Sequence, residues 1–334
     1  MTLGATTPPV DPDIAQAVRR AAVRATLAPS IHNTQPWRFT LNQSSLEIHA
    51  DWNRRLRVLD PRGRQLLISC GCATFNARVA LAAAGYEATV ERFPEEVQPN
   101  LLVRLTVPGP RVDEVPIGAF DRLVELRHTN RRRFVDEPTP GDVVEALVKA
   151  ASDEGAELFP ITRQEHRLAT ARLSQQADHV ENLDLAYRAE LQAWTTGDPR
   201  RRDGVPAPTE PHEDAGAHDG LSIRDFDAYG MGWLPTETRT NVNQCLLLLG
   251  TRQDTPAAWL RAGEALERVL LEVTRRGYVA SPITQLIEVA TTNALLRHEL
   301  QLTMHPHVLL RVGRAPMTPS SRRRRFVDML EVSR

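Results

Sequence analysis

The stretch 71–86, GCATFNARVALAAAGY, decides the fold because a second stretch, 263–278, GEALERVLLEVTRRGY, aligns with it without a gap. The first glycine, the last glycine and the closing tyrosine match, and each matched pair is separated by 192 positions. Both stretches have the pattern of an amphipathic helix that ends at glycine, the usual residue after a helix C-terminus. Two such helices can be similar by chance, so the residues downstream decide between chance and duplication.

A similar strand pattern follows each of these helices. LLVRLTVPGP begins at Leu101 and VLLRVGRAP begins at Val308, which places Arg104 opposite Arg311. A matched helix followed by a matched strand favours internal duplication over chance. We therefore predict two related units, 11–112 and 113–334.

Other elements follow from apolar spacing, caps and prolines. We predict helices at 12–28, 64–84, 120–126, 140–151, 164–194 and 257–277, and strands at 39–49, 100–107, 156–162, 243–250 and 307–313. Residues 196–233 are rich in Pro, Gly, Asp and Arg, with few large apolar side chains. Loops of this length inside a domain are often functional, so this segment is a candidate lid, with a disordered surface excursion as the equal alternative.

Residues 28–37, APSIHNTQPW, form a proline-bounded loop with short polar side chains. Loops of this kind hold hydroxyl, amide and backbone groups toward a ligand. Asn33 and Gln35 each carry a donor and an acceptor, which suits a heterocycle with mixed edges, such as the pyrimidine rim of a flavin. The structural alternative makes these residues loop caps and Trp37 an ordinary core residue.

Residues 127–134, RHTNRRRF, place four arginines, a histidine and a threonine within eight positions. Arginine binds phosphate oxygens with two parallel hydrogen bonds, and a threonine hydroxyl adds a further donor. A solvated charged surface is the usual alternative for such a run. Because Thr129 and Phe134 interrupt the charges, we favour a buried anion site.

Composition limits the remaining classes. The chain has 334 residues, 41% of them hydrophobic and 25% charged, with a net charge of -1, which is typical of a soluble globular protein and not of a nucleic-acid binder. No apolar run approaches the roughly 18 residues of a membrane helix. The start, MTLGATTPPVDPD, predicts no secretion signal, and three cysteines fit a reducing compartment. We expect a cytoplasmic protein without a metal site. Cys70-x-Cys72 has no partner pair at zinc-ligand spacing, and His305-x-His307 precedes a predicted strand, where a structural role is favoured over a metal site.

The motifs resemble those of the FMN-dependent nitroreductases, and the chain is most similar to the Acg-type NAD(P)H nitroreductases of actinobacteria. Pro29–Trp37 matches the family's Pro-Ser-x-x-Asn-x-Gln-Pro-Trp loop, and Arg127–Arg131 is similar to the motif that holds the FMN phosphate. Ser281–Gln285 is similar to the segment that passes flavin N5, although Thr-Gln stands where many relatives have Glu-Gly. Arg323–Asp328 resembles the basic run that completes the phosphate site. The resemblance covers most of the chain, apart from the first few residues and about 196–240.

The resemblance implies an α+β, nitroreductase-like fold. Nitroreductases are typically homodimers with FMN at the interface, where one subunit supplies the phosphate donors and the other supplies the loop. Here the loop comes first and the arginine motif second, inside one chain. We therefore interpret the chain as a pseudo-dimer produced by internal duplication, with one FMN per chain, and a monomer is plausible.

The resemblance also implies the ligand contacts. The expected cofactor-binding residues are Pro29, Ser30, Ile31, Asn33, Gln35, Arg127, His128, Thr129, Arg131, Pro282, Ile283, Thr284, Gln285, Arg323 and Arg324. No catalytic side chain is predicted, because the flavin itself carries out hydride transfer at N5. NAD(P)H that visits the flavin and leaves needs no motif of its own, so the lack of a G-x-G-x-x-G unit does not exclude reductase activity.

Two functions follow from the resemblance. The first is a flavoprotein oxidoreductase that transfers a hydride from NAD(P)H through FMN to a small nitro or quinone acceptor. The alternative is an FMN storage or sequestration protein with little turnover, suggested by the candidate lid and by the altered segment near N5. A nucleic-acid patch at Arg322–Arg325 is disfavoured by the overall charge.

Overall fold

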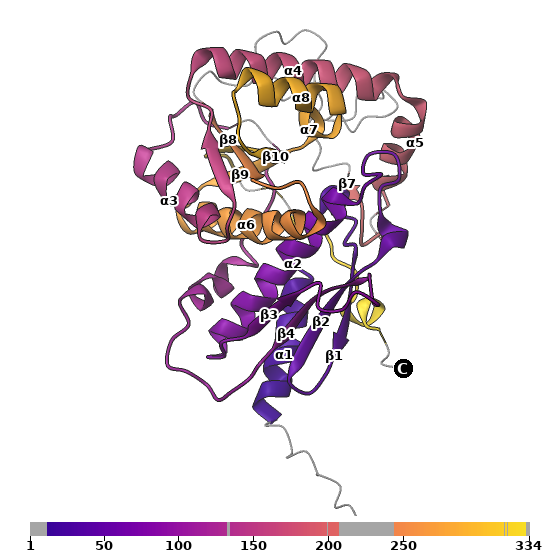
Figure 1. Ribbon diagram of the computed structural model, residues 1–334, viewed down its shortest axis with the longest axis vertical. Coiled ribbons are helices and arrows are strands. Elements are labelled where there is room, and N and C mark those ends of the chain that lie inside the picture. The colour runs from indigo at the N-terminus through magenta and orange to yellow at the C-terminus, as the bar shows by residue number, and fades with distance from the viewer. Residues whose placement is uncertain are drawn as a thin grey trace, which may run out of the picture.

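Two 20-residue helices, α2 (Arg64–Ala83) and α6 (Pro256–Arg275), pack against each other at the centre of the fold. A computed structural model describes residues 12–131, 134–198, 200–206, 244–316, 318 and 320–331. Figure 1 shows α2 and α6 stacked between a lower and an upper group of strands. Each helix therefore has the other helix on one side and its own sheet on the other.

The first sheet has the antiparallel order β1-β2-β4-β3. Its strands are β1 (Trp37–Leu41), β2 (Ser45–Ala50), β3 (Thr89–Arg92) and β4 (Leu101–Thr106). Helix α1 (Pro12–Ala25) packs on α2 through small side chains at helical spacing, including Ala21, Ala22 and Ala25. Small residues let the two helix backbones approach closely.

The second sheet has the antiparallel order β5-β8-β10-β9. Its strands are β5 (Glu157–Pro160), β8 (Cys245–Thr251), β9 (Val279–Ile283) and β10 (His305–Gly313). The helices of this half, besides α6, are α3 (Gly141–Ser152), α4 (Gln164–Leu183), α5 (Leu185–Trp194), α7 (Gln285–Glu288) and α8 (Ala290–Glu299). Strand β8 is apolar throughout because it is covered on both faces, by the α6 cluster on one and by the α4, α7 and α8 cluster on the other.

The two sheets have the same topology. In each, the first two strands pair and the fourth strand inserts between the second and the third. In each, a helix precedes the first strand and a central helix separates the second strand from the third. The second half adds α4 and α5 before its second strand, and α7 and α8 before its last. This agreement supports the predicted duplication, which stays a prediction together with the boundary near residue 112.

The two matched glycines lie where α2 and α6 cross. A Cβ atom on Gly71 would lie 2.0 Å from the Leu260 carbonyl oxygen, and one on Gly263 would lie 2.0 Å from the Ile68 carbonyl oxygen. Each glycine therefore meets the carbonyl three residues before the other glycine, so the contact is reciprocal. The two Cα atoms come so close that any side chain at either position clashes with backbone.

The C-terminal segment, residues 320–331, returns to the first half. Its 3₁₀ helix Phe326–Met329 lies beside β1, where Leu330 forms a bridge with Phe39 and the Glu331 N–H donates to the Phe39 carbonyl at 2.8 Å. Figure 1 shows this end of the chain at the outer side of β1. The second unit thus completes the edge of the first sheet.

Most predicted elements are present, with differences that have local causes. The predicted strand 39–49 is a hairpin of β1 and β2, and the predicted helix 164–194 is broken at Asp184, whose carboxylate accepts from Ala186 N and caps α5. The helical run 120–126 is part of a 3₁₀ helix, Pro116–Leu123. Strands β3 and β9 and helices α7 and α8 were not predicted.

Helix α2 corrects the expectation that no segment is long and apolar enough to cross a membrane. By length and hydropathy α2 passes that test, but 89% of its most apolar window is buried inside the fold, as in the core helix of a soluble protein. Cys70, Cys72 and Cys245 are free cysteines. Within the described ranges, no group of three His, Cys, Asp or Glu side chains is arranged to hold a metal ion.

We predict that Gly71→Ala lowers the free energy of unfolding by about 2 kcal/mol or more, because the new methyl group overlaps a backbone carbonyl that cannot move aside. Urea unfolding followed by circular dichroism measures this change. Gly141→Ala is the matched control, because its Cβ atom would meet nothing within 4 Å. Equal stability of the two variants would contradict the close helix contact.

Candidate functional site

The loop 28–37, called the 30-loop below, has a strained backbone. His32, Asn33 and Gln35 have φ angles of 45°, 52° and 50°, in the left-handed region that side chains other than glycine and asparagine rarely adopt. Such strain persists only where surrounding contacts fix it, and it is common at binding sites. The Ser30 hydroxyl provides one such contact by accepting from the Gln35 N–H at 2.9 Å.

Asn33 connects the 30-loop to two distant segments. Its Nδ2 donates to the Gly204 carbonyl at 3.0 Å and to the Arg322 carbonyl at 3.1 Å, and its Oδ1 accepts from Arg323 Nη1 at 3.2 Å. These bonds satisfy both ends of the Asn33 amide within the protein. Asn33 therefore shapes the site at least as much as it offers contacts to a ligand.

Gln35 has a similar anchoring role and is fully buried. Its Nε2 donates to the Arg202 carbonyl at 2.8 Å, and its Oε1 accepts from the Arg324 N–H at 2.8 Å. Arg324 in turn donates to the Gln35 carbonyl at 3.1 Å. The structure thus places these two predicted ligand contacts away from the cavities, where they hold the loop to the C-terminal segment.

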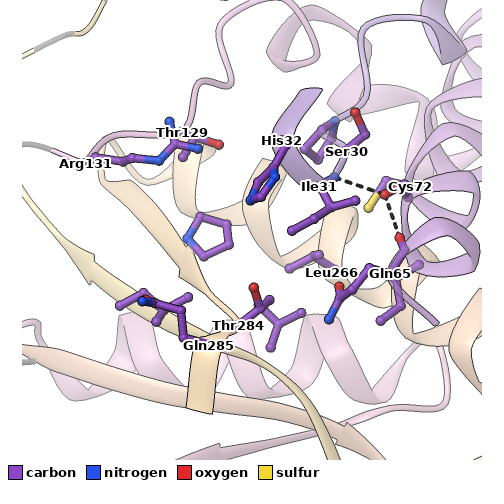
Figure 2. Close-up of a pocket in the computed structure, with 16 residues that line it drawn as sticks. Ser30, Ile31, His32, Gln65, Cys72, Thr129, Arg131, Leu266, Thr284 and Gln285 are labelled. Carbon is purple, nitrogen blue, oxygen red and sulfur yellow. Dashed lines mark hydrogen bonds between the residues drawn. The ribbon is translucent and has the colours of Figure 1, made fainter. Parts of the chain in front are cut away.

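A first cavity of about 760 Å³, including space open to solvent, lies between the 30-loop, α2, α6 and β9. Figure 2 shows Ser30, Thr129 and Thr284, which come from three different segments, around this space. The lining residues are Pro29, Ser30, Ile31, His32, Gln65, Ile68, Ser69, Cys72, Thr129, Arg131, Leu266, Pro282, Ile283, Thr284, Gln285 and Val308. The size and the mixture of apolar and polar groups are typical of a small-molecule site.

A second cavity of about 470 Å³ shares Pro29, Ser30, Thr129 and Arg131 with the first. Its further lining residues are Asn33, Arg127, His128, Val205, Ser321 and Arg323. The 30-loop and the arginine motif, residues 127–134, therefore lie side by side although about a hundred residues separate them. Residues 132 and 133 of the motif lie outside the described residues.

The arginine motif is held in place by β9. The Asn130 N–H donates to the Ala280 carbonyl at 2.9 Å, and Thr129 forms a parallel bridge with Ala280. Pro282 and Ile283 follow at the end of the same strand. This pairing explains why residues near 130 and residues 282–285 line the same space.

Among the predicted residues, only Gln35 and Arg324 lie outside both cavities. The sequence analysis missed His32 and the contributions of the central helices, Gln65, Ser69, Cys72 and Leu266. Gln65, Ser69 and Cys72 recur at helical spacing within an otherwise apolar helix, so one polar stripe on α2 was the available signal.

The second cavity is electropositive. Burial and the neighbouring Arg127 lower the pKa of Arg323 to about 9, and burial followed by both arginines lowers the pKa of His128. Arg127 is 5% exposed, and its Nη1 is buried without a hydrogen-bond partner in the described part of the chain. Two cations held this close, with an unsatisfied donor, favour binding of an anion.

Arg323 is a structural anchor as well as a charge. Its Nη2 donates to the carbonyls of Leu27 and Ala28, at 3.2 and 3.3 Å, just beyond the end of α1. Cations near a helix C-terminus are stabilised by its dipole. Arg323 therefore joins the C-terminal segment to both α1 and the 30-loop while its charge faces the second cavity.

Residues 195–206 are attached to the 30-loop through Arg54. Arg54 Nε donates to the Thr34 carbonyl at 2.5 Å, and its guanidinium pairs with Asp203 and lies 5.4 Å from the Trp194 ring centroid. Arg201 also pairs with Asp203 and lies 5.5 Å from the same ring. Most of the candidate lid 196–233 falls in 207–243, outside the described residues.

Comparison with known proteins identifies the class. The chain is 35% identical over 322 residues to "Putative NAD(P)H nitroreductase Rv3131" of Mycobacterium tuberculosis, covering 95% of this chain and 92% of that protein. It is 31% identical over 304 residues to "Putative NAD(P)H nitroreductase acg" of the same organism, covering 90% and 89%. No protein-family model matches. The chain belongs to the Acg-type family of NAD(P)H nitroreductases, which confirms the predicted resemblance.

The crystal structure of the FMN-dependent nitroreductase NfnB from Mycobacterium smegmatis in complex with NADPH is a weak structural match. It is 16% identical, with a TM-score of 0.38, and the match covers 65% of this chain and 99% of that chain. The family assignment therefore rests on the sequence relatives.

We predict that Arg323→Ala lowers the thermal stability of the flavin-free protein by about 2 kcal/mol, because five acceptors, at the end of α1, in the 30-loop and in the C-terminal segment, lose their donor. Differential scanning calorimetry gives the change in Tm. Arg325→Ala is the matched control from the same basic run, since Arg325 is exposed and, among the described residues, its ion pair is with the nearby Asp328. An equal loss in both variants would remove the anchoring role.

Proposed function

We propose that this nitroreductase-family oxidoreductase binds one FMN across the two neighbouring cavities and transfers a hydride from NAD(P)H to a small nitro or quinone acceptor. The observation that carries the proposal is that the 30-loop and the arginine motif together line each of two neighbouring cavities. NAD(P)H is the proposed reductant because two similar proteins are named as NAD(P)H nitroreductases.

The second cavity fits a phosphate group. Arg127 Nη1 is buried without a partner among the described residues, and the neighbouring Arg323 adds a second positive charge. A phosphate monoester carries close to two negative charges at neutral pH and offers three acceptor oxygens. A bound phosphate would neutralise the positive charge of the two arginines and so reduce their mutual repulsion. It would also accept a hydrogen bond from the unsatisfied Arg127 Nη1.

The first cavity fits a flat heterocycle with polar edges. Ile31, Ile68, Leu266 and Val308 supply apolar wall, and amide and hydroxyl groups such as Gln65 stand among them (Figure 2). When bound, FMN supplies the two-electron chemistry between donor and acceptor. The chain's own residues bind and orient the ring and exclude water from one side, so no side-chain acid or base is assigned.

One ion-pair network supports a single flavin per chain. Cys72 on α2 lines the first cavity, and the matched position on α6 is Glu264. Glu264 is fully buried and pairs with Arg78 at 2.7 Å and with Arg92, on β3, at 2.6 Å. Strand β3 has the place in the first sheet that β9 has in the second. Under the proposed duplication, ion pairs fill the position where a second flavin would lie.

The proposal has consequences for assembly and location. Because both sides of the pocket come from one chain, a monomer can form the complete site, unlike the shared site of a homodimer. We also propose a cytoplasmic location, where NAD(P)H is available as the reductant.

FMN storage with little turnover is the second candidate. One observation favours it: residues 200–206 lie against the 30-loop, and Val205 lines the second cavity next to the arginines. A protein segment beside the cofactor restricts access to it. Storage and catalysis differ in whether reductant reaches the bound flavin.

We predict a yellow protein with one FMN per chain that bleaches when NADH or NADPH is added without oxygen. The visible spectrum, flavin extraction and stopped-flow absorbance measure colour, stoichiometry and reduction. Bleaching supports the oxidoreductase, whereas oxidised flavin that persists with both reductants supports storage. A colourless protein that ignores added FMN would refute both.

We predict that Arg127→Ala and Asn33→Ala each weaken FMN binding by about tenfold to a hundredfold, because each leaves charged or polar partners unsatisfied. Quenching of flavin fluorescence measures the dissociation constants. Arg122→Ala is the control, because Arg122 is exposed and lines neither cavity. Weakening by the arginine variant alone would contradict a pocket shared between the two halves.

A further inference from the structure

A fully buried carboxylate, that of Glu267, lies next to Arg127 of the arginine motif. Glu267 on α6 is 0% exposed, and its Oε1 lies 3.4 Å from Arg127 Nε. The amide of Asn76, on α2, faces the same carboxylate. Neither oxygen of Glu267 has a hydrogen bond of good geometry within the described part of the chain.

The negative charge of the Glu267 carboxylate is energetically unfavourable for two reasons. A buried charge is stable only when it is well paired, and here the ion pair with Arg127 is long and lacks supporting hydrogen bonds. A carboxylate behind a phosphate site also repels the phosphate. Removal of Glu267 would leave Arg127 and Arg323 as two close cations whenever the cavity is empty. The negative charge of Glu267 therefore stabilises the two arginines when the cavity is empty and disfavours phosphate binding when the cavity is filled.

We propose that Glu267 is a positioning residue that holds the Arg127 guanidinium at the second cavity and takes up a proton from solvent when a phosphate monoester binds there. The inference rests on the proposed function in taking FMN as the ligand that brings the phosphate. The carboxylate pairs with Arg127 in the empty site, and the neutral acid replaces it when the phosphate takes over as the counter-ion. The hydronium ion or protonated buffer that supplies the proton loses its bond to hydrogen, the Glu267 carboxyl gains an O–H bond, and no other bond changes.

The imidazole of His128, neutral in the empty site, and the Glu267 carboxylate are the two described groups near the second cavity that can take up a proton near pH 7 when a dianion binds, and the variants below isolate the share of Glu267. Burial raises the pKa of Glu267 to about 7, against the opposing effects of Arg127, Asn76 and Arg323. Burial raises the pKa of the Cys72 thiol well above its usual value, and burial and both arginines lower the pKa of His128. A dianion bound nearby disfavours the charged carboxylate further, so the pKa of Glu267 rises on binding and a proton is taken up.

Titration calorimetry of the flavin-free full chain tests the proposal directly. FMN binding at pH 7.5, in buffers of different ionisation enthalpy, gives the number of protons taken up per flavin. We expect uptake of a substantial fraction of one proton with FMN and none with riboflavin, which lacks the phosphate. FMN itself contributes little, because its phosphate is almost fully ionised at this pH.

A variant pair separates Glu267 from the rest of the helix. In the wild type, the ratio of riboflavin to FMN dissociation constants should fall as pH rises from 6.5 to 8.5, by at most about tenfold per unit. Glu267→Gln keeps the size of the side chain and should make this ratio higher at pH 8.5, with a much shallower pH dependence. Glu272→Gln is the control, because Glu272 is also a buried carboxylate of α6. It pairs with Arg276 and lines neither cavity. The Glu272→Gln variant should keep the wild-type dependence.

The outcomes distinguish this inference from the proposed function. FMN that binds more tightly than riboflavin, but without proton uptake and with the same pH dependence in Glu267→Gln, overturns the role of Glu267 and leaves the phosphate site intact. FMN that binds no better than riboflavin overturns the phosphate site and the inference together. If Glu267→Gln does not fold, the proton count of His128→Gln decides: uptake that persists supports Glu267, and uptake that is lost assigns the proton to His128 and overturns the proposal.

Discussion

The contact between Gly71 and Gly263 is the constraint on which the rest of the structure depends. It sets how closely α2 and α6 approach, and these helices carry one sheet each. Both helices also contribute cavity walls, Ser69 and Cys72 from one and Leu266 from the other. A side chain at either glycine would separate the helices and widen the cavity between them. The contact between the two glycines therefore fixes both the helix packing in the core and the width of the cavity.

The strained backbone of the 30-loop is held in place by contacts with two other segments of the chain. The left-handed conformations in the 30-loop are fixed by the Asn33 and Gln35 amides, which bond to residues 200–206 and to the C-terminal segment. Arg323 fastens the same C-terminal segment to the end of α1. Because these contacts involve protein groups only, much of the pocket shape exists before a ligand binds, which lowers the ordering cost of binding.

The sequence predicted most helices and strands, but not the contacts that join distant segments around the candidate site. The motifs near residues 30 and 130 stood out by their own composition, but only the resemblance to nitroreductases implied that they share a site. The structure places them side by side, and their role in binding a flavin stays a prediction. The helical pattern predicted α2 and α6 themselves but not the contact between them. Strand β9 was missed because Pro282 interrupts its pattern, and the helix break at Asp184 was missed because a single cap causes it. The anchoring of Gln35 by Arg324 joins residues 289 positions apart, and no local pattern encodes such a contact.

The span between Asn33 and Arg323, 290 positions, has a consequence for biosynthesis. The pocket needs both residues, so it cannot close while the ribosome is still making the second sheet. A nascent first half would leave the apolar face of α2 uncovered until α6 emerges, a condition that favours chaperone capture and aggregation. Non-local contacts of this length also slow folding. Under the proposed function, loading of the flavin is therefore a late, post-translational event.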